Sequence, residues 1–417
     1  MTSESAAPEH ASSNALHHRP FVFYLLAVGA AGFAVQIMSV AVGWQVYDIT
    51  RNPLDLGFIG LAQFLPPLCL VLVTGLAADA FNRRLIMAGC LLVEVLCALA
   101  LVAFTLSVPS GVWPVFVILA VLGAARAFFN PAADALAPNL LPRQAIAHGI
   151  SLGSMVWQVG TIAGPVVGGL LYGIGGAAAY GTSFGLLGLA AVFVLLIGAV
   201  PQANHAQETS FATLLAGFRF IRRERIVLGA ISLDLFAVLL GGAVALMPVY
   251  ARDILEVGPW GLGLLRASPG IGAIVMAAWL AKFPIKDKAG LIMFIFVATF
   301  GLFTVVFGFS TYVPLSIAAL AVMGASDMVS VYVRETLMQL RTPDEVRGRV
   351  TAVNRVFIGA SNELGEVRAG LVAAWIGAVA AVAVGGAGTV AVAFLWSRWF
   401  PELRTARRLD GRSREAG

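Results

Sequence analysis

The sequence predicts an all-α integral membrane protein in which twelve transmembrane helices form two parallel six-helix repeats. Of the residues, 59% are hydrophobic and only 12% are charged, whereas a soluble globular chain carries about 25% charged residues. Apolar runs of the roughly 20 residues that a spanning helix needs follow one another along most of the chain. The second half of the chain also repeats the pattern of the first. Helices are the expected form of these runs, because a helix satisfies its own backbone polar groups in lipid.

Twelve spans can be placed in order along the chain. Each is a long apolar run between polar connections, and the 45 glycines would let neighbouring helices approach closely. The expected spans cover residues 21–47, 55–79, 84–106, 112–137, 149–173, 177–200, 226–250, 259–281, 289–309, 312–338, 350–374 and 376–398. The expected domains are an N-terminal tail at 1–20, a first bundle at 21–200, a linker at 201–225, a second bundle at 226–398 and a basic tail at 399–417.

The connections between the spans alternate in charge. Every second connection is rich in basic residues, as in "FRFIRRER" at 218–225, whereas the other set holds only Arg51 and Arg252. Under the positive-inside rule, this pattern places both termini in the cytoplasm. The topology also accounts for the net charge of +5. A basic tail could bind anionic lipid, but we expect no nucleic-acid partner.

A shift of 201 residues superimposes spans two to five on spans eight to eleven. The matched pairs are mostly glycines and acids: Gly57 with Gly258, Gly60 with Gly261, Gly123 with Gly324, Asp134 with Glu335, and Gly164 with Gly365. One shift serves four consecutive spans, so the two halves have the same orientation. Parallel repeats of this kind form one architecture of secondary transporters, in which the substrate site lies between the repeats.

The stretch "GLAADAFNRR" at 75–84 places an acid and two arginines between two long apolar runs. Through Gly75, Asp79, Arg83 and Arg84 it resembles the loop 2–3 signature of the major facilitator superfamily, although other positions depart from it. The resemblance implies that Asp79, Arg83 and Asp134 latch the helix ends together in the outward-facing state. An ion pair that only anchors the topology is the alternative.

The stretch "GTIAGPVVGG" at 160–169 resembles a second signature of this superfamily, one associated with exporters. All its fixed positions match, namely Gly160, Gly164, Pro165, Gly168 and Gly169. Close helix packing alone would also explain glycines spaced by four on one helix face. Longer stretches, "VYARDILEVGPWGLGLLRASPGIGA" among them, look like the subgroup that contains the enterobactin exporter and related drug and macrolide effluxers. The cargo differs within that subgroup and does not carry over.

An ionisable residue inside a span is costly and marks a candidate functional site. The resemblance implies that spans one, four, seven and ten line the central cavity, which favours Arg126, Asp234 and Asp327 as the proton or substrate site. The 201-residue shift relates Arg126 to Asp327, so we expect these two to face each other across the cavity. The alternative is that such charges only neutralise one another. The secondary candidates are Gln36, Trp44, Asn130, Arg334, Glu335, Glu363 and Glu366, whereas Glu94 is expected to be structural.

Several other chemistries find no support in the sequence. It contains no Gly-x-x-x-x-Gly-Lys-Ser/Thr phosphate loop, so we do not expect ATP-driven transport by this chain. Its five histidines and three cysteines form no metal-ligand pattern, and no motif of an enzyme nucleophile is present. We therefore expect no cofactor, no metal and no enzymatic activity.

The sequence thus predicts a monomeric secondary active transporter. It would export an amphiphilic organic molecule, such as a siderophore or a drug, across the inner membrane in exchange for protons. Two alternatives stay open. One is an importer or uniporter of the same fold, and the other is a membrane receptor or scaffold that kept the fold without transporting.

Overall fold

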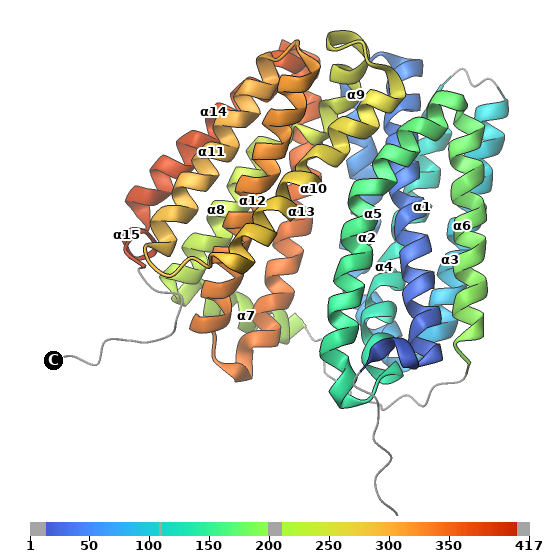
Figure 1. The fold of residues 1–417 in the computed structure, drawn as a ribbon, viewed down its shortest axis with the longest axis horizontal. Coiled ribbons are helices and arrows are strands. Elements are labelled where there is room, and N and C mark those ends of the chain that lie inside the picture. The colour runs from blue at the N-terminus through green and yellow to red at the C-terminus, as the bar shows by residue number, and fades with distance from the viewer. Residues whose placement is uncertain (1–13, 108–110, 199–210, 407–417) are drawn as a thin grey trace, which may run out of the picture.

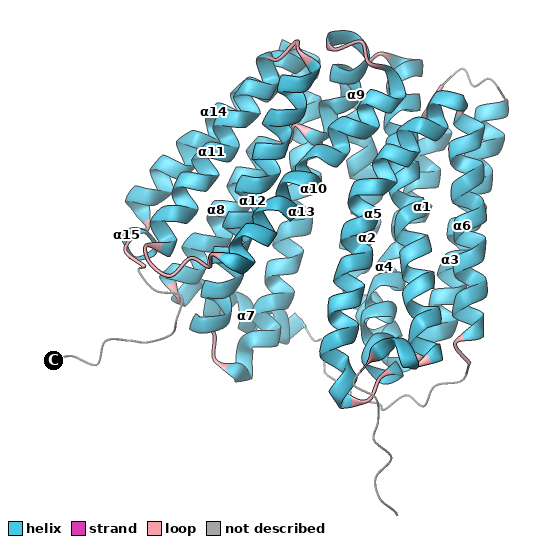
Figure 2. Cartoon of the chain, in the orientation of Figure 1, coloured by secondary structure: helices cyan, strands magenta, loops and turns pink. Residues whose placement is uncertain are grey.

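The computed structural model describes residues 14–107, 111–198 and 211–406, except for the side chains of residues 72, 78, 79 and 211–216. All the elements in these ranges are helical (Figure 2). The long helices are α1 (Arg19–Thr50), α2 (Pro53–Ala80), α3 (Arg83–Leu106), α4 (Trp113–Leu136), α5 (Ile146–Ile174), α6 (Gly176–Leu196), α8 (Arg225–Gly241), α10 (Gly258–Lys282), α11 (Ala289–Phe309), α12 (Val313–Arg341), α13 (Asp344–Ile376) and α14 (Ala378–Trp399). The shorter segments are η1 (Ala15–His17), η2 (Ala137–Leu140), η3 (Arg143–Ala145), α7 (Phe211–Arg223), η4 (Val244–Leu246), α9 (Met247–Val249), η5 (Tyr250–Ile254) and α15 (Pro401–Arg404).

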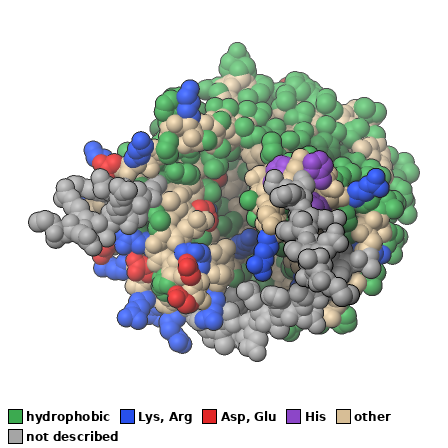
Figure 3. Space-filling view, turned by 60° about the horizontal axis from the view of Figure 1, so that its bottom comes forward, with side chains coloured by type: hydrophobic (Ala, Val, Ile, Leu, Met, Phe, Trp, Pro, Cys, Tyr) green, Lys and Arg blue, Asp and Glu red, His purple; other side chains and the backbone are tan. Residues whose placement is uncertain are grey.

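The long helices form two bundles that stand side by side (Figure 1). Helices α1–α6 pack against one another in the N-terminal bundle, and α8 and α10–α14 do so in the C-terminal bundle. The bundles meet where α5 packs on α10 and where α2 packs on α13. The start of α1, α7 and α15 lie at one end, which we call the termini end. Charged side chains gather on that end, whereas much of the remaining visible surface is hydrophobic (Figure 3).

Eleven helical segments of the described chain are long and apolar enough to cross a membrane. They correspond to eleven of the expected spans. The remaining span, expected at 350–374, lies within α13, which has 33 residues but carries more charge than the others. Large apolar side chains on the outside, such as Trp375 at 83% exposure, suit contact with lipid. The predicted all-helical membrane fold is therefore confirmed.

The seventh span differs from the continuous helix expected at 226–250. Helix α8 ends at Gly241, and the chain continues through Gly242 into η4, α9 and η5. Gly242 lies against α13, where an added Cβ would stand 2.6 Å from the carbonyl oxygen of Gly365. Arg368 of α13 donates a hydrogen bond to the carbonyl of Leu240, which satisfies one of the acceptors that an ending helix leaves open. The apolar pattern hid this break because glycine is frequent in membrane helices.

The segment expected as a linker, 201–225, also contains a helix. Residues 201–210 lie outside the described part of the chain, and residues 211–223 form α7. This helix packs on α13 at the termini end, where a Cβ at Gly217 would lie 2.7 Å from the carbonyl oxygen of Arg349. The second half of the connection is thus folded against the C-terminal bundle.

The two bundles approach most closely in the half of the molecule opposite the termini end. There a Cβ at Gly169 of α5 would lie 2.4 Å from the carbonyl oxygen of Pro259, and a Cβ at Gly263 of α10 would lie 2.5 Å from that of Pro165. The contact of α2 with α13 in this half is also backbone to backbone. Nearer the termini end, Gly160 of α5 has no atom within 4 Å of the place a Cβ would take. We call the tightly packed end the closed end.

Gly169→Ala should destabilise the protein, because the added methyl group has no room against the backbone of Pro259. Overpacking of this kind costs about 1–3 kcal/mol, which would lower the melting temperature of the purified protein by several degrees. Gly160→Ala makes the same chemical change on the same helix in open surroundings, and its melting temperature should not change. Equal melting temperatures for the two variants would contradict the close contact of α5 and α10.

Candidate functional site

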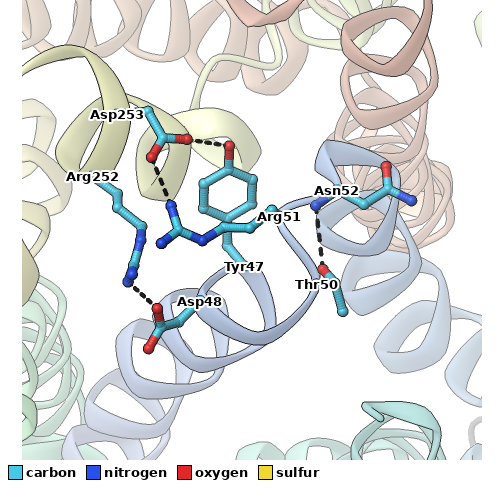
Figure 4. A network of polar contacts seen from close by, with 7 residues as sticks. All are labelled: Tyr47, Asp48, Thr50, Arg51, Asn52, Arg252 and Asp253. Carbon is cyan, nitrogen blue, oxygen red and sulfur yellow. Dashed lines mark hydrogen bonds and ion pairs between the residues drawn. The ribbon is translucent and has the colours of Figure 1, made fainter. Parts of the chain in front are cut away.

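Two ion pairs join the bundles at the closed end (Figure 4). Arg51, which follows α1, reaches Asp253 of η5, with 3.0 Å between Nη1 and Oδ1. Arg252 of η5 forms an ion pair with Asp48 of α1. Arg51 and Arg252 stand one repeat of 201 residues apart. Each bundle therefore contributes one arginine and one aspartate, and we call this reciprocal set of four residues the closing network.

Aromatic side chains of α1 support the closing network. The hydroxyl of Tyr47 donates a hydrogen bond to Asp253, and the guanidinium of Arg252 lies 5.4 Å from the centre of the Trp44 ring. Trp44, one of the secondary candidates, is only 7% exposed and therefore lies beneath the network. The network itself stays accessible, because the side chains of Arg51 and Asp253 are 53% and 38% exposed.

A second set of polar groups lies deeper between the bundles. Arg266 of α10 donates a hydrogen bond from Nη1 to the hydroxyl of Ser39 of α1, at 2.5 Å. Glu363 and Glu366, one turn apart on α13, face α2, where a Cβ at Gly60 would lie 3.2 and 2.9 Å from one oxygen of each. The charges of Arg266 and Glu366 interact. Both carboxylates of α13 therefore lie at the interface between the two bundles.

The C-terminal bundle holds a cluster of two carboxylates and one arginine. Asp234 of α8 forms an ion pair with Arg334 of α12, and these residues are 7% and 3% exposed. Asp327, two turns before Arg334, lines a small cavity together with Asp234. Asp327 has no hydrogen-bond or ion-pair partner among the described residues. The structure therefore brings together the two aspartates that the sequence singled out.

Two acidic residues that are one repeat of 201 residues apart, Asp134 and Glu335, contact α13 close to the termini end. Asp134 of α4 pairs with Arg355, with 3.5 Å between Oδ2 and Nη1, in an exposed contact between the bundles. Its repeat partner Glu335 accepts a hydrogen bond from Asn354 at 3.1 Å and lies 3.9 Å from Nε of Arg334. The contact of Asp134 is longer and more exposed than those of the closing network.

The residues of the loop 2–3 signature lie beside Asp134. Arg83 is 8% exposed and donates a hydrogen bond at 2.9 Å to the carbonyl of Ala135, the neighbour of Asp134 in the chain. Arg83 and Asp134 are thus close to each other, as a latch would require. The other signature residues are Gly75 in α2, Arg84 at the start of α3, and Asp79 at the end of α2, whose side chain lies outside the described residues.

Arg126 has a different partner from the one predicted. Its Nη1 lies 3.2 Å from Oε2 of Glu94 of α3, whose side chain is fully buried. The guanidinium also lies 5.7 Å from the centre of the Phe129 ring. In this structure Arg126 therefore pairs with Glu94 and not with Asp327. The repeat relates positions in the two bundles but does not select a partner, and Glu94 neutralises Arg126 within the N-terminal bundle.

The glycine motif of α5 forms a packing surface. A Cβ at Gly164 would lie 2.5 Å from Cβ of Gln36 of α1, and a Cβ at Gly168 would lie 3.0 Å from Cα of Ile37. Gln36 is therefore a packing residue at this contact, while Gly169 faces α10. Pro165, the proline of the same motif, has its backbone carbonyl against Gly263 of α10. Asn130, one of the secondary candidates for the transport site, is exposed on α4.

The sequence did carry a signal for the closing network, although the prediction missed it. Arg51 and Arg252 are the two basic residues in an otherwise sparsely charged set of connections, and they are one repeat apart. Arginine is disfavoured in connections on the non-cytoplasmic side. Its presence there at equivalent positions of both repeats indicates that the two arginines have the same role. Arg266 also carried a signal, as an ionisable residue inside a span, but it was passed over because the resemblance did not assign its helix to the cavity.

The profile of the family described as "Transmembrane secretion effector" matches residues 11–415. The chain belongs to this family. Among its relatives, the multidrug efflux pump Tap of Mycolicibacterium fortuitum is 29% identical over 366 residues, which cover 84% of this chain and 88% of that protein. The enterobactin exporter EntS of Shigella boydii serotype 18 is 25% identical over 407 residues, which cover 94% of each chain.

Solved structures of transporters share the fold. A POT family transporter has a TM-score of 0.74 at 12% identity and covers 92% of this chain and 96% of its own. A bacterial homolog of the human lysosomal transporter Spinster has a TM-score of 0.72 at 13% identity, with 96% and 99% covered. The nucleoside transporter NupG has a TM-score of 0.70 at 13% identity, with 91% and 99% covered. Through its family and its relatives, the chain is a multi-pass transporter of the major facilitator superfamily and not an enzyme.

Arg51→Ala should make the closed end open more often, because it leaves Asp253 without its arginine. An exposed ion pair contributes about 1 kcal/mol or less, so the open fraction should rise by up to roughly fivefold. The readout is the rate at which a water-soluble thiol reagent modifies a cysteine introduced at Gly43, beneath the network. The measurement uses a variant in which the native Cys69, Cys90 and Cys97 are replaced, so that the reagent can react with the introduced cysteine alone.

Arg225→Ala is the matched control for Arg51→Ala. It removes an exposed ion pair of the same 3.0 Å length, to Glu402, that lies within the C-terminal bundle. The rate of modification at Gly43→Cys should not change in this control. A rate in Arg51→Ala as slow as in the control would show that the closing network does not hold the end shut.

Arg126→Leu should sharply lower stability and yield, because it leaves Glu94 buried without a counter-charge. Removing one partner of a buried ion pair costs about 3–5 kcal/mol. The double variant Arg126→Leu with Glu94→Leu should recover most of that loss, since apolar replacement of a whole buried pair is often neutral. Thermal unfolding of the two variants measures the effect. A double variant as unstable as the single one would give Arg126 a role beyond neutralising Glu94.

Proposed function

We propose that this protein exports an amphiphilic organic molecule across the inner membrane, by alternating access and in exchange for protons. The observation that carries the proposal is the reciprocal pairing of Arg51 and Arg252 at one end of the interface. At the other end the bundles touch through the long, exposed contact of Asp134 and Arg355. Two bundles with tight contact at one end only can expose a site between them to one side of the membrane at a time.

In this proposal the termini and α7 lie in the cytoplasm, and the closing network faces the outside. The basic connections at the termini end support this orientation, because Lys and Arg favour the cytoplasmic side. The structure then represents the state open to the cytoplasm, in which an exporter takes up its cargo. The Spinster homolog, which shares the fold, was solved in an inward-facing conformation.

The opposite state requires the termini end to close. The position of Arg83 beside Asp134 supports a latch there, with Asp79 as the third member. Arg355, which holds Asp134 in the present state, would have to release it. In this account Asp134 exchanges one basic partner for another as the bundles move.

Asp327 is the residue that we assign to the exchanged proton. Its neighbour Asp234 is already neutralised by Arg334, so Asp327 is the carboxyl group of the cluster without a partner. Asp327 is partly exposed within a span, where an uncompensated charge is expensive, and binding a proton removes that charge. Asp327 and Asp234 lie on different helices, so a movement of α8 against α12 would change the charge that Asp327 faces.

The relatives support the class of cargo and the direction of transport. They are named as a multidrug efflux pump and an enterobactin exporter, and the motif from Gly160 to Gly169 is associated with exporters. Arg266, Glu363 and Glu366 supply polar groups deep in the interface, where an amphiphilic molecule could be oriented. We expect a monomer to suffice, because one chain contains both bundles.

Transport by proteoliposomes under an imposed pH gradient tests the proposal. A catecholate siderophore and a panel of drugs would be offered one at a time. Accumulation against the cargo gradient, driven by the pH gradient in the export direction, is the expected result. Movement only down the cargo gradient would indicate a uniporter, and accumulation in the other direction an importer. Failure to move any of the compounds would favour the receptor or scaffold reading.

Asp327→Asn should abolish accumulation driven by the pH gradient and leave exchange of cargo for cargo intact, because Asn cannot carry a proton. The two activities are measured in the same proteoliposomes with the first compound found to be transported. Asp344→Asn is the control, since Asp344 pairs with Arg347 on the surface and its side chain is 82% exposed. Gradient-driven accumulation that survives in Asp327→Asn would remove this residue from the coupling step.

A further inference from the structure

The cavity beside Asp327 has more oxygen donors than proton binding requires. Its polar lining consists of Asp234, Ser326, Asp327 and Ser330, and the rest of the lining is apolar, namely Ala237, Val238, Val297 and Phe300. Two aspartates and two serines therefore line one small cavity between α8, α11 and α12. The cavity has about the size of one water molecule.

Among the residues that line the cavity, Ser330 has a buried hydroxyl that no contact in the fold accounts for. It is 3% exposed, and its hydroxyl oxygen has no hydrogen-bond partner among the described residues. Other serines of the spans, such as Ser232 and Ser268, donate to the carbonyl one turn earlier in their own helix. A buried hydroxyl without a partner costs about 1–3 kcal/mol. Because Ser330 lines the cavity, a species inside it could supply the partner that this hydroxyl lacks.

The charges around the cavity leave one negative charge in excess. Arg334 forms an ion pair with Asp234, and Asp327 lies close enough to both for their charges to act on it. Helix α11 contains no charged residue. On α10, Arg266 is directed to Ser39 of α1. One excess negative charge matches a monovalent cation, and carboxylate and hydroxyl oxygens are the ligands that hard cations prefer.

We propose that this cavity is a binding site for Na⁺, held by Asp327, Asp234 and the hydroxyls of Ser326 and Ser330, in competition with a proton on Asp327. The proposal rests on the proposed function of Asp327 and adds a second coupling ion to it. Either ion removes the excess charge, so the two exclude each other. A bare Na⁺ fits a cavity of this size, and the free oxygen of Ser330 becomes a ligand.

Binding of radioactive Na⁺ to the purified full-length protein tests the proposal. Choline chloride keeps the ionic strength constant, and the titration is repeated at several pH values. We expect saturable binding that weakens as the pH falls, by roughly tenfold per pH unit in the range where the proton competes for one site.

Two variants locate the site. Asp327→Asn should abolish saturable Na⁺ binding, and Ser330→Ala should weaken it by roughly tenfold, the equivalent of one lost polar contact. Ser268→Ala is the matched control, because Ser268 is as buried as Ser330 but bonds to its own helix away from the cavity. Its Na⁺ affinity should equal that of the unmodified protein.

Absence of saturable Na⁺ binding at any pH, or binding that persists in Asp327→Asn, would overturn the proposal. Binding that does not change with pH would do so as well, and this measurement needs no variant that might fail to fold. The test is independent of transport. Proton-driven export without Na⁺ binding would remove only the Na⁺ site, whereas Na⁺ binding without proton-driven export would keep the site and contradict proton antiport.

Discussion

The reciprocal pairing of two arginines across the closed end is the constraint on which the rest of the structure depends. Arg51 and Arg252 occupy equivalent positions of the two repeats, and each reaches an aspartate of the other bundle. Neither bundle can turn away at this end without breaking both pairs. Exposed ion pairs contribute about 1 kcal/mol or less each. Their sum is small enough for bound cargo or a bound ion to reverse, as a two-state transporter requires.

The seventh span links the closing network to the buried carboxylate cluster. Its first part, α8, carries Asp234, and its last part, η5, carries Arg252 and Asp253. The break at Gly241 and Gly242 lies between them. In the proposed cycle, release of η5 at the closed end would let α8 shift at this break and would disturb the ion pair of Asp234 with Arg334. In contrast, Arg126 and Glu94 stay within the N-terminal bundle and need not change as the bundles move.

The spans, their order and the repeat could be predicted from the sequence, because long apolar runs and a constant shift are properties of the chain itself. The break in the seventh span could not be predicted. The glycine at the break allows close contact with α13, and the local sequence pattern does not show which helix packs there. The high cost of charge in lipid marked Asp234 and Asp327 as candidates, and the resemblance selected them by implying that their spans line the cavity. The partner of Arg126 was misassigned, because a partner depends on how α3 packs on α4. Ser330 was not singled out at all, since only its surroundings make its hydroxyl unusual.

The most direct test of alternating access is to measure two distances across the interface in the same molecules. One pair of labels would span the closed end, at residues 50 and 255, and the other would span the termini end, at residues 143 and 341. The account predicts opposite changes when cargo and a pH gradient are supplied in membranes, so that the first distance lengthens as the second shortens. Two distances that lengthen together, or that never change while cargo is being transported, would contradict it.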